Sequence, residues 1–126
     1  GCVNCREMEA RRWSDPAVLR RLKEDFVVVA LYVDEKTELP EEAWYTSEYD
    51  GKVKKTIGKQ NADLQIRRFN NNAQPYYVLL NDQGELLAEP KAYDLSVSNF
   101  VDFLELGKQR FAAGETIEDD PALAKK

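Results

Sequence analysis

The chain has 126 residues, of which 43% are hydrophobic and 33% are charged, and its formal net charge is −5. This length predicts a single domain. The basic residues are interspersed with acids and form no nucleic-acid footprint. No apolar run is long enough to span a bilayer. Because the sequence opens directly on a reactive motif, we expect it to be a piece of a longer protein, with its targeting signals upstream.

Both cysteines lie within the first five residues, as Cys2 and Cys5, directly before an expected helix. A helix N-terminus carries free N–H groups and partial positive charge, which stabilise a thiolate. By position, Cys2 is the expected nucleophile, and Cys5, one helical turn further on, is the expected resolving cysteine. A zinc site is disfavoured because the sequence has no histidine and no third cysteine. A small structural disulfide is the alternative to redox chemistry.

The next stretch predicts a helix followed by a strand. Pro16, with Ser14 or Asp15 as cap, predicts that a helix over 3–24 is broken near the proline. Residues 26–33 are apolar without alternation and rich in β-branched side chains. This pattern is typical of a strand that is covered on both faces, as in a parallel sheet flanked by helices.

Residues 35–60 are less regular and predict an insertion that carries a small hairpin. The insertion contains three aromatic residues, Trp44, Tyr45 and Tyr49. We favour the interpretation that these rings cover an edge of the core, and contact with a partner is the alternative. Asn61 is the expected cap of the helix that follows.

A second hairpin is expected after Pro75. The residues that follow it, 76–80, form a strongly predicted strand, and proline is tolerated at the first position of a strand. Turn residues at 81–84 then predict that 85–89 pairs back as the second arm.

The last expected element is an amphipathic helix that ends at Gly114. Its apolar side chains follow the helical spacing of Val97, Phe100, Val101 and Leu104. Residues 115–126 are charged and are expected to form a loose tail. The sequence therefore predicts one domain over 1–114 followed by this tail.

This order of elements resembles the thioredoxin fold from its active site onward, over about residues 1–113. More narrowly, residues 1–9 followed by Trp13 and Asp15-Pro16 are similar to the C-terminal thioredoxin-like domain of bacterial thiol:disulfide interchange proteins of the DsbD type. Residues 73–80 are similar to the cis-proline segment of such domains. The resemblance implies an α/β thioredoxin-like fold that lacks its N-terminal strand or strands and carries the insertion at 35–60.

The resemblance also implies roles for individual residues. Cys2 matches the nucleophilic cysteine and Cys5 the resolving one. Pro75 matches the cis-proline that faces the disulfide, and Gln74 before it is expected to present backbone groups to an extended substrate. The implied substrate-binding residues are Val3, Asn4, Gln74 and Pro75.

The implied function is that of a protein-disulfide reductase. Such a domain takes electrons from a membrane-embedded partner domain and passes them to disulfide-containing proteins in the periplasm or cell envelope. It needs no cofactor and no metal, and nucleic acid is not an expected partner. The alternatives are a disulfide isomerase or oxidase, and a non-enzymatic binding module with a structural Cys2–Cys5 bridge.

The sequence departs from the pattern of many thioredoxins in three ways. Val3-Asn4 stands between the cysteines, where many carry Gly-Pro. Ala30 stands where many carry a lysine near the end of the buried strand. The strand that normally precedes the active-site turn is missing as well. A chain that begins at Gly1 is therefore expected to expose strand edges and to associate unless something fills the gap.

Overall fold

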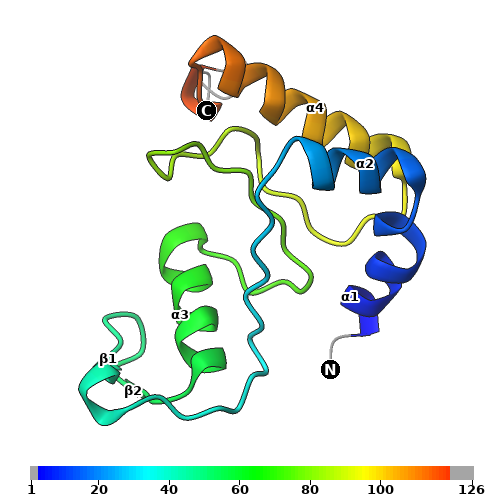
Figure 1. The fold of residues 1–126 in the computed structure, drawn as a ribbon. Helices are drawn as coiled ribbons and strands as arrows, with labels where there is room; N and C mark the ends of the chain where they lie inside the picture. The colour runs from blue at the N-terminus through cyan, green and yellow to red at the C-terminus, as the bar shows by residue number, and fades with distance from the viewer. Residues whose placement is uncertain (1–2, 120–126) are drawn as a thin grey trace. The chain divides into compact units, whose positions relative to one another are not determined.

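The computed structural model describes residues 3–119, apart from the side chains of residues 11 and 12. These residues form two compact units (Figure 1). One unit spans residues 29–73, and the other combines residues 3–28 with 74–119. Among the described helices, none has both the length and the apolar character needed to cross a membrane.

The discontinuous unit begins with a helical run that has a break, as predicted. Helix α1 spans Val3–Met8 and continues into a π-helix, η1, over Glu9–Trp13. Helix α2 follows over Pro16–Glu24, with its proline in the first turn. The Asp15 side chain accepts a backbone N–H of this turn at 2.9 Å, so Asp15 is the cap and the predicted break near the proline is confirmed.

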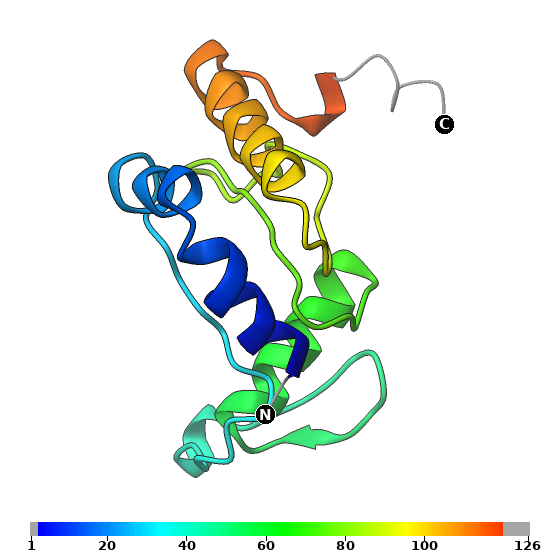
Figure 2. The ribbon, with the colours of Figure 1, turned by 90° about the vertical axis from the view of Figure 1, so that its right-hand side faces the viewer.

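Helix α4, Val97–Ala113, is the amphipathic helix that the sequence predicts. The Ser96 side chain caps its first turn, and Gly114 ends it in the left-handed conformation with φ 70°, which glycine adopts without a steric penalty. α4 packs beside α2 (Figure 2). An ion pair of 2.7 Å between Arg21 Nε and Glu105 Oε1 joins the two helices.

The apolar core of the described residues lies entirely in this unit. Its buried members are Met8, Val18, Leu79, Leu87, Ala88, Phe100, Phe103 and Leu104. After α4, the short 3-10 helix η3 spans Ile117–Asp119. The Ile117 N–H donates to the carbonyl of Leu86 at 2.8 Å, which attaches this segment to the same unit.

The segment after Pro75 folds back on itself, as predicted, but it forms isolated bridges instead of regular strands. The antiparallel bridges join Tyr77 to Lys91 and Leu80 to Leu86. The Leu87 N–H also donates to the Leu79 carbonyl at 2.8 Å. The hairpin topology is therefore confirmed, whereas continuous strands over 76–80 and 85–89 are wrong. The reason is that a two-stranded ribbon has no neighbouring strand to extend its ladder.

The continuous unit, residues 29–73, consists of one long helix and a small hairpin. Helix α3 spans Ile57–Phe69. Strand β1, Tyr45–Thr46, pairs antiparallel with β2, Val53–Lys54, and the 3-10 helix η2, Glu41–Ala43, precedes them. The small hairpin predicted within 35–60 is therefore confirmed.

The aromatic residues of the hairpin do not share one environment. Trp44 and Tyr45 are half-buried, and the indole N–H of Trp44 donates to the Leu39 carbonyl at 2.8 Å. Tyr49 is 63% exposed. The interpretation that these rings cover an edge of the structure fits the first two and is wrong for Tyr49.

α3 begins at a different residue from the one predicted. The Thr56 side chain caps it by accepting the Lys59 N–H at 3.2 Å. Asn61 lies inside the helix, and its side chain donates to the Tyr32 carbonyl at 2.9 Å. Asn61 as the cap is therefore wrong, because Thr56 offers a suitable cap one turn earlier. The helix ends at Asn70, whose φ of 50° is a left-handed conformation that asparagine tolerates.

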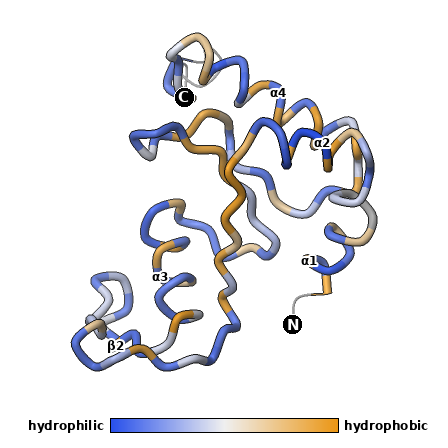
Figure 3. Tube along the Cα trace, in the orientation of Figure 1, coloured by the Kyte–Doolittle hydropathy of each residue, from blue (hydrophilic) through white to orange (hydrophobic). Residues whose placement is uncertain are grey.

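The prediction of a buried strand over 26–33 is wrong. The run is strongly hydrophobic (Figure 3), yet it forms no strand, and Val27 is 94% exposed. Within the described part of the chain, the only hydrogen bond to its backbone is the one from Asn61 to the Tyr32 carbonyl. A central strand needs neighbours along both edges, and the described residues supply none. In this described part of the chain, the sheet is therefore limited to β1 and β2, a partial α/β arrangement.

We predict that the run 26–33 makes the protein self-associate, because exposed apolar backbone without a sheet partner is a template for pairing. Val27→Lys places a charge at its most exposed position and should raise the monomer fraction in size-exclusion chromatography with light scattering. Surface substitutions of this kind change the free energy of unfolding by only about 0.5 kcal/mol. Val53→Lys, in the paired strand β2, is the control and should leave association unchanged. A monomer fraction equal to wild type in Val27→Lys would contradict the prediction.

We also predict that Gly58→Ala destabilises the continuous unit. A Cβ at Gly58 would lie 2.5 Å from the Val33 carbonyl oxygen and 2.6 Å from that of Glu35. These are backbone atoms that cannot move aside as a flexible side chain can, so the cost should be about 1–3 kcal/mol. Hydrogen exchange of the α3 amides measures it, with the exposed neighbour Lys59→Ala as control. Unchanged protection in Gly58→Ala would show that this close approach is absent in solution.

Candidate functional site

The structure places Cys5 in the first turns of α1, where it is half-buried and disulfide-bonded. Cys2 lies outside the described residues, so its predicted role as nucleophile stays a prediction. Val3 and Asn4 are both exposed, so their side chains are available to a partner. The described part of the motif therefore combines a half-buried sulfur with an exposed neighbouring surface.

Met8 fixes the position of the helix that carries Cys5. Its side chain is fully buried and belongs to the core cluster with Val18 and Phe100. Residues three apart lie on the same side of a helix, so Cys5 shares the inward side of α1 with Met8. This arrangement explains why Cys5 is less exposed than Val3 and Asn4.

The Gln74–Pro75 peptide bond is cis, which is the geometry that the resemblance implies. Pro75 is buried and Gln74 is half-buried. Their expected part in binding substrate stays a prediction. Gln74 and Pro75 belong to the same compact unit as Cys5.

Two aromatic rings connect the helix of Cys5 with the segment after Pro75. Trp13 is the last residue of η1, and its ring meets that of Tyr77 with centroids 5.9 Å apart and planes at 65°. Tyr77 also meets Phe100 of α4 edge-on, at 5.1 Å and 89°. Such edge-to-face contacts are favourable beyond the apolar area that they bury. The helix of Cys5 and the proline segment are thus packed against the same core.

Tyr77 is a neutral phenol in this environment. Burial raises the pKa of Tyr77 to about 12; the indole of Trp13 acts in the opposite direction, and the charge of Glu9 adds to the rise. Neither the Tyr77 hydroxyl nor the Trp13 indole N–H has a partner in full hydrogen-bond geometry among the described residues. Tyr77 therefore contributes packing near pH 7 and does not act as a base.

The sequence analysis includes Trp13 and Tyr77 in the segments that carry the resemblance, but it assigns neither of them a role in this region. Each carried a usable signal: Trp13 ends the helix of the cysteine motif, and Tyr77 follows Pro75 by two positions. What the sequence could not show is that these two rings meet, because 64 positions separate them.

Among the residues that the structure describes, no group of three or more histidine, cysteine, aspartate or glutamate side chains could hold a metal ion. The group of this site that is capable of covalent chemistry, among the described residues, is the sulfur of Cys5 in α1. A half-buried sulfur on a well-anchored helix can form and break a disulfide when a second thiol reaches it.

A comparison with protein families matches residues 1–107 to the thioredoxin-like domain. The matched range includes both cysteines, Pro75 and the first part of α4. No curated protein matches the chain. Since the match covers most of the sequence and agrees with the cysteine motif and the cis-proline segment, the chain belongs to the thioredoxin-like domain family.

Proposed function

We propose that this protein is a thiol–disulfide oxidoreductase that acts as a dithiol reductase on disulfide-containing proteins. The observation that carries the proposal is the state of Cys5, a disulfide-bonded cysteine on an anchored helix of a thioredoxin-like domain. The Cys-x-x-Cys spacing with Cys2 supplies the second sulfur that exchange requires.

In the proposed reaction, the Cys2 thiolate attacks one sulfur of the partner's disulfide. A bond forms between Cys2 and that sulfur, the partner's S–S bond breaks, and the released partner thiolate takes up a proton. The Cys5 thiolate then attacks the Cys2 sulfur and releases the second partner thiol. Two electrons and two protons have then passed to the partner, and the cysteines of the chain are joined as a disulfide.

The described residues around Cys5 support this reaction by holding the helix. Met8 anchors α1 in the core, and the Trp13–Tyr77 contact holds the end of η1 beside the proline segment. In this proposal, Val3, Asn4 and Gln74 meet the partner's backbone, and the buried Pro75 contributes by setting the direction of the chain at Gln74. A rigid scaffold of this kind keeps the reacting groups oriented.

A second dithiol must reduce the cysteine pair again after each turnover. We propose that a membrane-embedded dithiol domain supplies these electrons and that the partners are proteins of the periplasm or cell envelope. The resemblance to thiol:disulfide interchange proteins of the DsbD type supports this part of the proposal.

We predict that Cys2→Ser abolishes disulfide exchange, whereas Cys5→Ser traps a mixed disulfide with a partner. The first attack survives in Cys5→Ser, but no thiol remains to resolve it. Non-reducing electrophoresis after incubation with an oxidised protein substrate measures the trapped species. The Cys2→Ser/Cys5→Ser double variant is the control and should trap nothing. Equal trapping by the two single variants would refute the assignment of roles.

The reduction potential separates the reductase from its alternatives. Thioredoxin-like reductants lie near −270 mV and strong oxidants near −120 mV. We expect a value close to the first, measured by equilibration of the purified chain with glutathione buffers. A potential near the second would identify an oxidase. If the chain does not exchange with the small disulfide DTNB, the reductase proposal is wrong. The remaining alternative is then a non-enzymatic binding module in which the Cys2–Cys5 bridge is structural.

A further inference from the structure

We propose that Tyr77 is a positioning residue, whose ring sets the place of the Gln74 backbone relative to the helix of Cys5. This inference rests on the proposed function and adds the residue that determines how well a partner's backbone is bound. Tyr77 should therefore act on the KM for peptide disulfides, whereas exchange with a small disulfide, which has no backbone to bind, should not depend on it. All contacts that carry the inference lie within the discontinuous unit.

The backbone of Tyr77 is fixed by two hydrogen bonds to Lys91. The Tyr77 N–H donates to the Lys91 carbonyl at 2.7 Å, and the Lys91 N–H donates to the Tyr77 carbonyl at 3.0 Å. The Lys91 side chain pairs with Asp94 at 3.0 Å, and Asp94 accepts the N–H of Ser96, the cap of α4, at 2.8 Å. The backbone of Tyr77 is thus connected to the start of α4 through Lys91 and Asp94.

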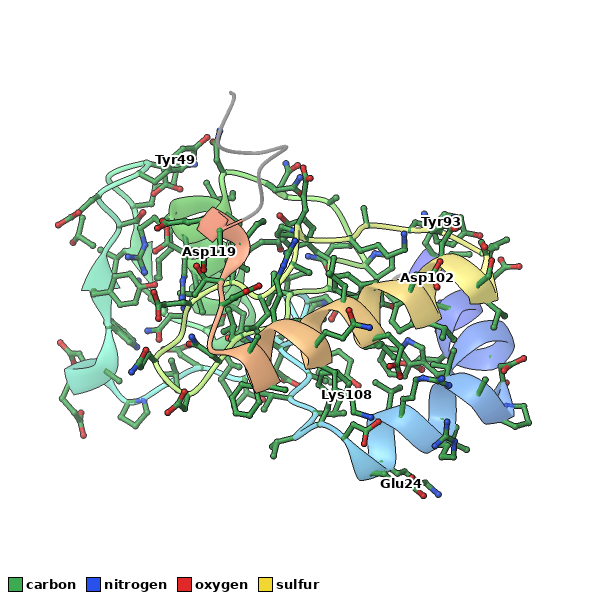
Figure 4. The ribbon with its side chains drawn as sticks, turned by 90° about the horizontal axis from the view of Figure 1, so that it is seen from above. Glu24, Tyr49, Tyr93, Asp102, Lys108 and Asp119 are labelled. Atoms are coloured by element: carbon green, nitrogen blue, oxygen red, sulfur yellow. The ribbon has the colours of Figure 1, made fainter. Side chains whose placement is uncertain are left out.

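The ring of Tyr77 contacts two helices. It meets Phe100 of α4 edge-on, with centroids 5.1 Å apart, and Trp13 at the end of η1, with centroids 5.9 Å apart. α4 is a fixed reference for this ring, because it lies beside α2, and Lys108 pairs with Asp25 at the end of α2 at 3.1 Å (Figure 4). Tyr77 therefore holds η1 and its own segment against the same helix.

The hydroxyl of Tyr77 does not account for this position. The hydroxyl and the indole N–H of Trp13 are both buried, and neither has a partner in full hydrogen-bond geometry among the described residues. A buried polar group without a partner opposes folding. The ring is therefore the part of Tyr77 that stabilises the arrangement, and a phenylalanine ring can replace it.

The contact between Trp13 and Tyr77 joins the two segments that a partner meets in the proposed reaction. Gln74 precedes Tyr77 by three residues, which span at most about 10 Å of extended chain. Cys5 precedes Trp13 by eight residues, which span about 12 Å at the rise of an α-helix. The ring contact therefore connects Gln74 and Cys5 through two short segments, and its loss should change their relative position.

Met8 keeps this effect separate from the reactivity of the sulfur. It lies three residues after Cys5 and is fully buried in the core, so it holds α1 in the folded unit when the Tyr77 ring is removed. The sulfur then stays reactive but is displaced relative to Gln74. A change that affects only substrate binding raises KM and leaves kcat unchanged.

The test uses two disulfide-closed peptides of one sequence, one of which carries N-methyl groups on the backbone nitrogens beside its cysteines. N-methylation removes the backbone donors that pair with an exposed chain and leaves the disulfide in place. With dithiothreitol to reduce the chain after each turnover, the wild-type KM should be about ten-fold lower for the unmethylated peptide, at a similar kcat. Exchange with DTNB is measured separately on the reduced chain without dithiothreitol.

Tyr77→Leu keeps an apolar side chain but removes the ring. Its KM for the unmethylated peptide should rise to that of the methylated one, while exchange with DTNB stays at the wild-type rate. Tyr77→Phe keeps the ring and should keep the wild-type preference. Phe103→Leu is the matched control, because Phe103 is a buried ring that meets Phe100 at 5.8 Å and has no ring contact with Trp13 among the described residues. It should keep the preference even where it lowers Tm.

A further variant tests whether Tyr77 acts through Trp13. Trp13→Leu should lose the same preference for the unmethylated peptide. Adding Tyr77→Leu to it should raise KM no further, because residues that act through one contact are not additive. Additive increases in KM would overturn the claim that the contact between the two rings positions Gln74.

Binding is measured apart from exchange in the Cys2→Ser/Cys5→Ser chain, with the unmethylated peptide closed by a thioether in place of the disulfide. This peptide should shift the Gln74 amide resonance in the NMR spectrum, and adding Tyr77→Leu should remove the shift. A wild-type chain without the KM preference, or a preference that survives in Tyr77→Leu or is lost in Phe103→Leu, would overturn this inference. Absence of exchange with DTNB and with both peptides, alongside a Gln74 shift that depends on Tyr77, would instead overturn the proposed function alone.

Discussion

Among the residues that the structure describes, none pairs with the run 26–33 in a sheet, and the organisation of the chain follows from this constraint. Buried backbone N–H and carbonyl groups must be hydrogen-bonded. In the described residues, the Tyr32 carbonyl is the only backbone group of this run that makes a hydrogen bond. The run therefore stays in contact with water despite its apolar sequence. The segments before and after it satisfy their backbones locally, through helices and short hairpins, and the chain forms two units.

The two units are stabilised by different forces. The unit that contains Cys5 has the apolar core, in which Met8 and Phe100 are buried. The residues of the other unit that are most deeply buried include Asp63 and Ser47, which are joined by a hydrogen bond. In our proposed function, exchange chemistry belongs to the unit with the apolar core.

Long-range aromatic contacts explain how a short helix can hold the disulfide-bonded sulfur of Cys5 in place. α1 contains only six residues, and an isolated helix of this length is not stable in water. Met8 and the pair formed by Trp13 and Tyr77 attach the run to the core. Replacing any of these side chains would therefore act on Cys5 through the position of its helix.

The sequence by itself determined the features that depend on neighbouring residues. These are the helix start at Pro16 with a cap at Ser14 or Asp15, the amphipathic spacing of α4 with Gly114 at its end, and the cysteine motif. Tertiary structure decided the features that depend on distant ones. Thr56 and Asn61 are both suitable caps, so local propensity could not choose between them. Apolar character makes burial of 26–33 favourable, but burial also requires neighbouring strands along both edges, which no local pattern supplies. The hydrogen bonds that Asp63 accepts from Tyr45, Ser47 and Arg67 could not be predicted from the sequence for the same reason. They join side chains that only the folded chain brings together.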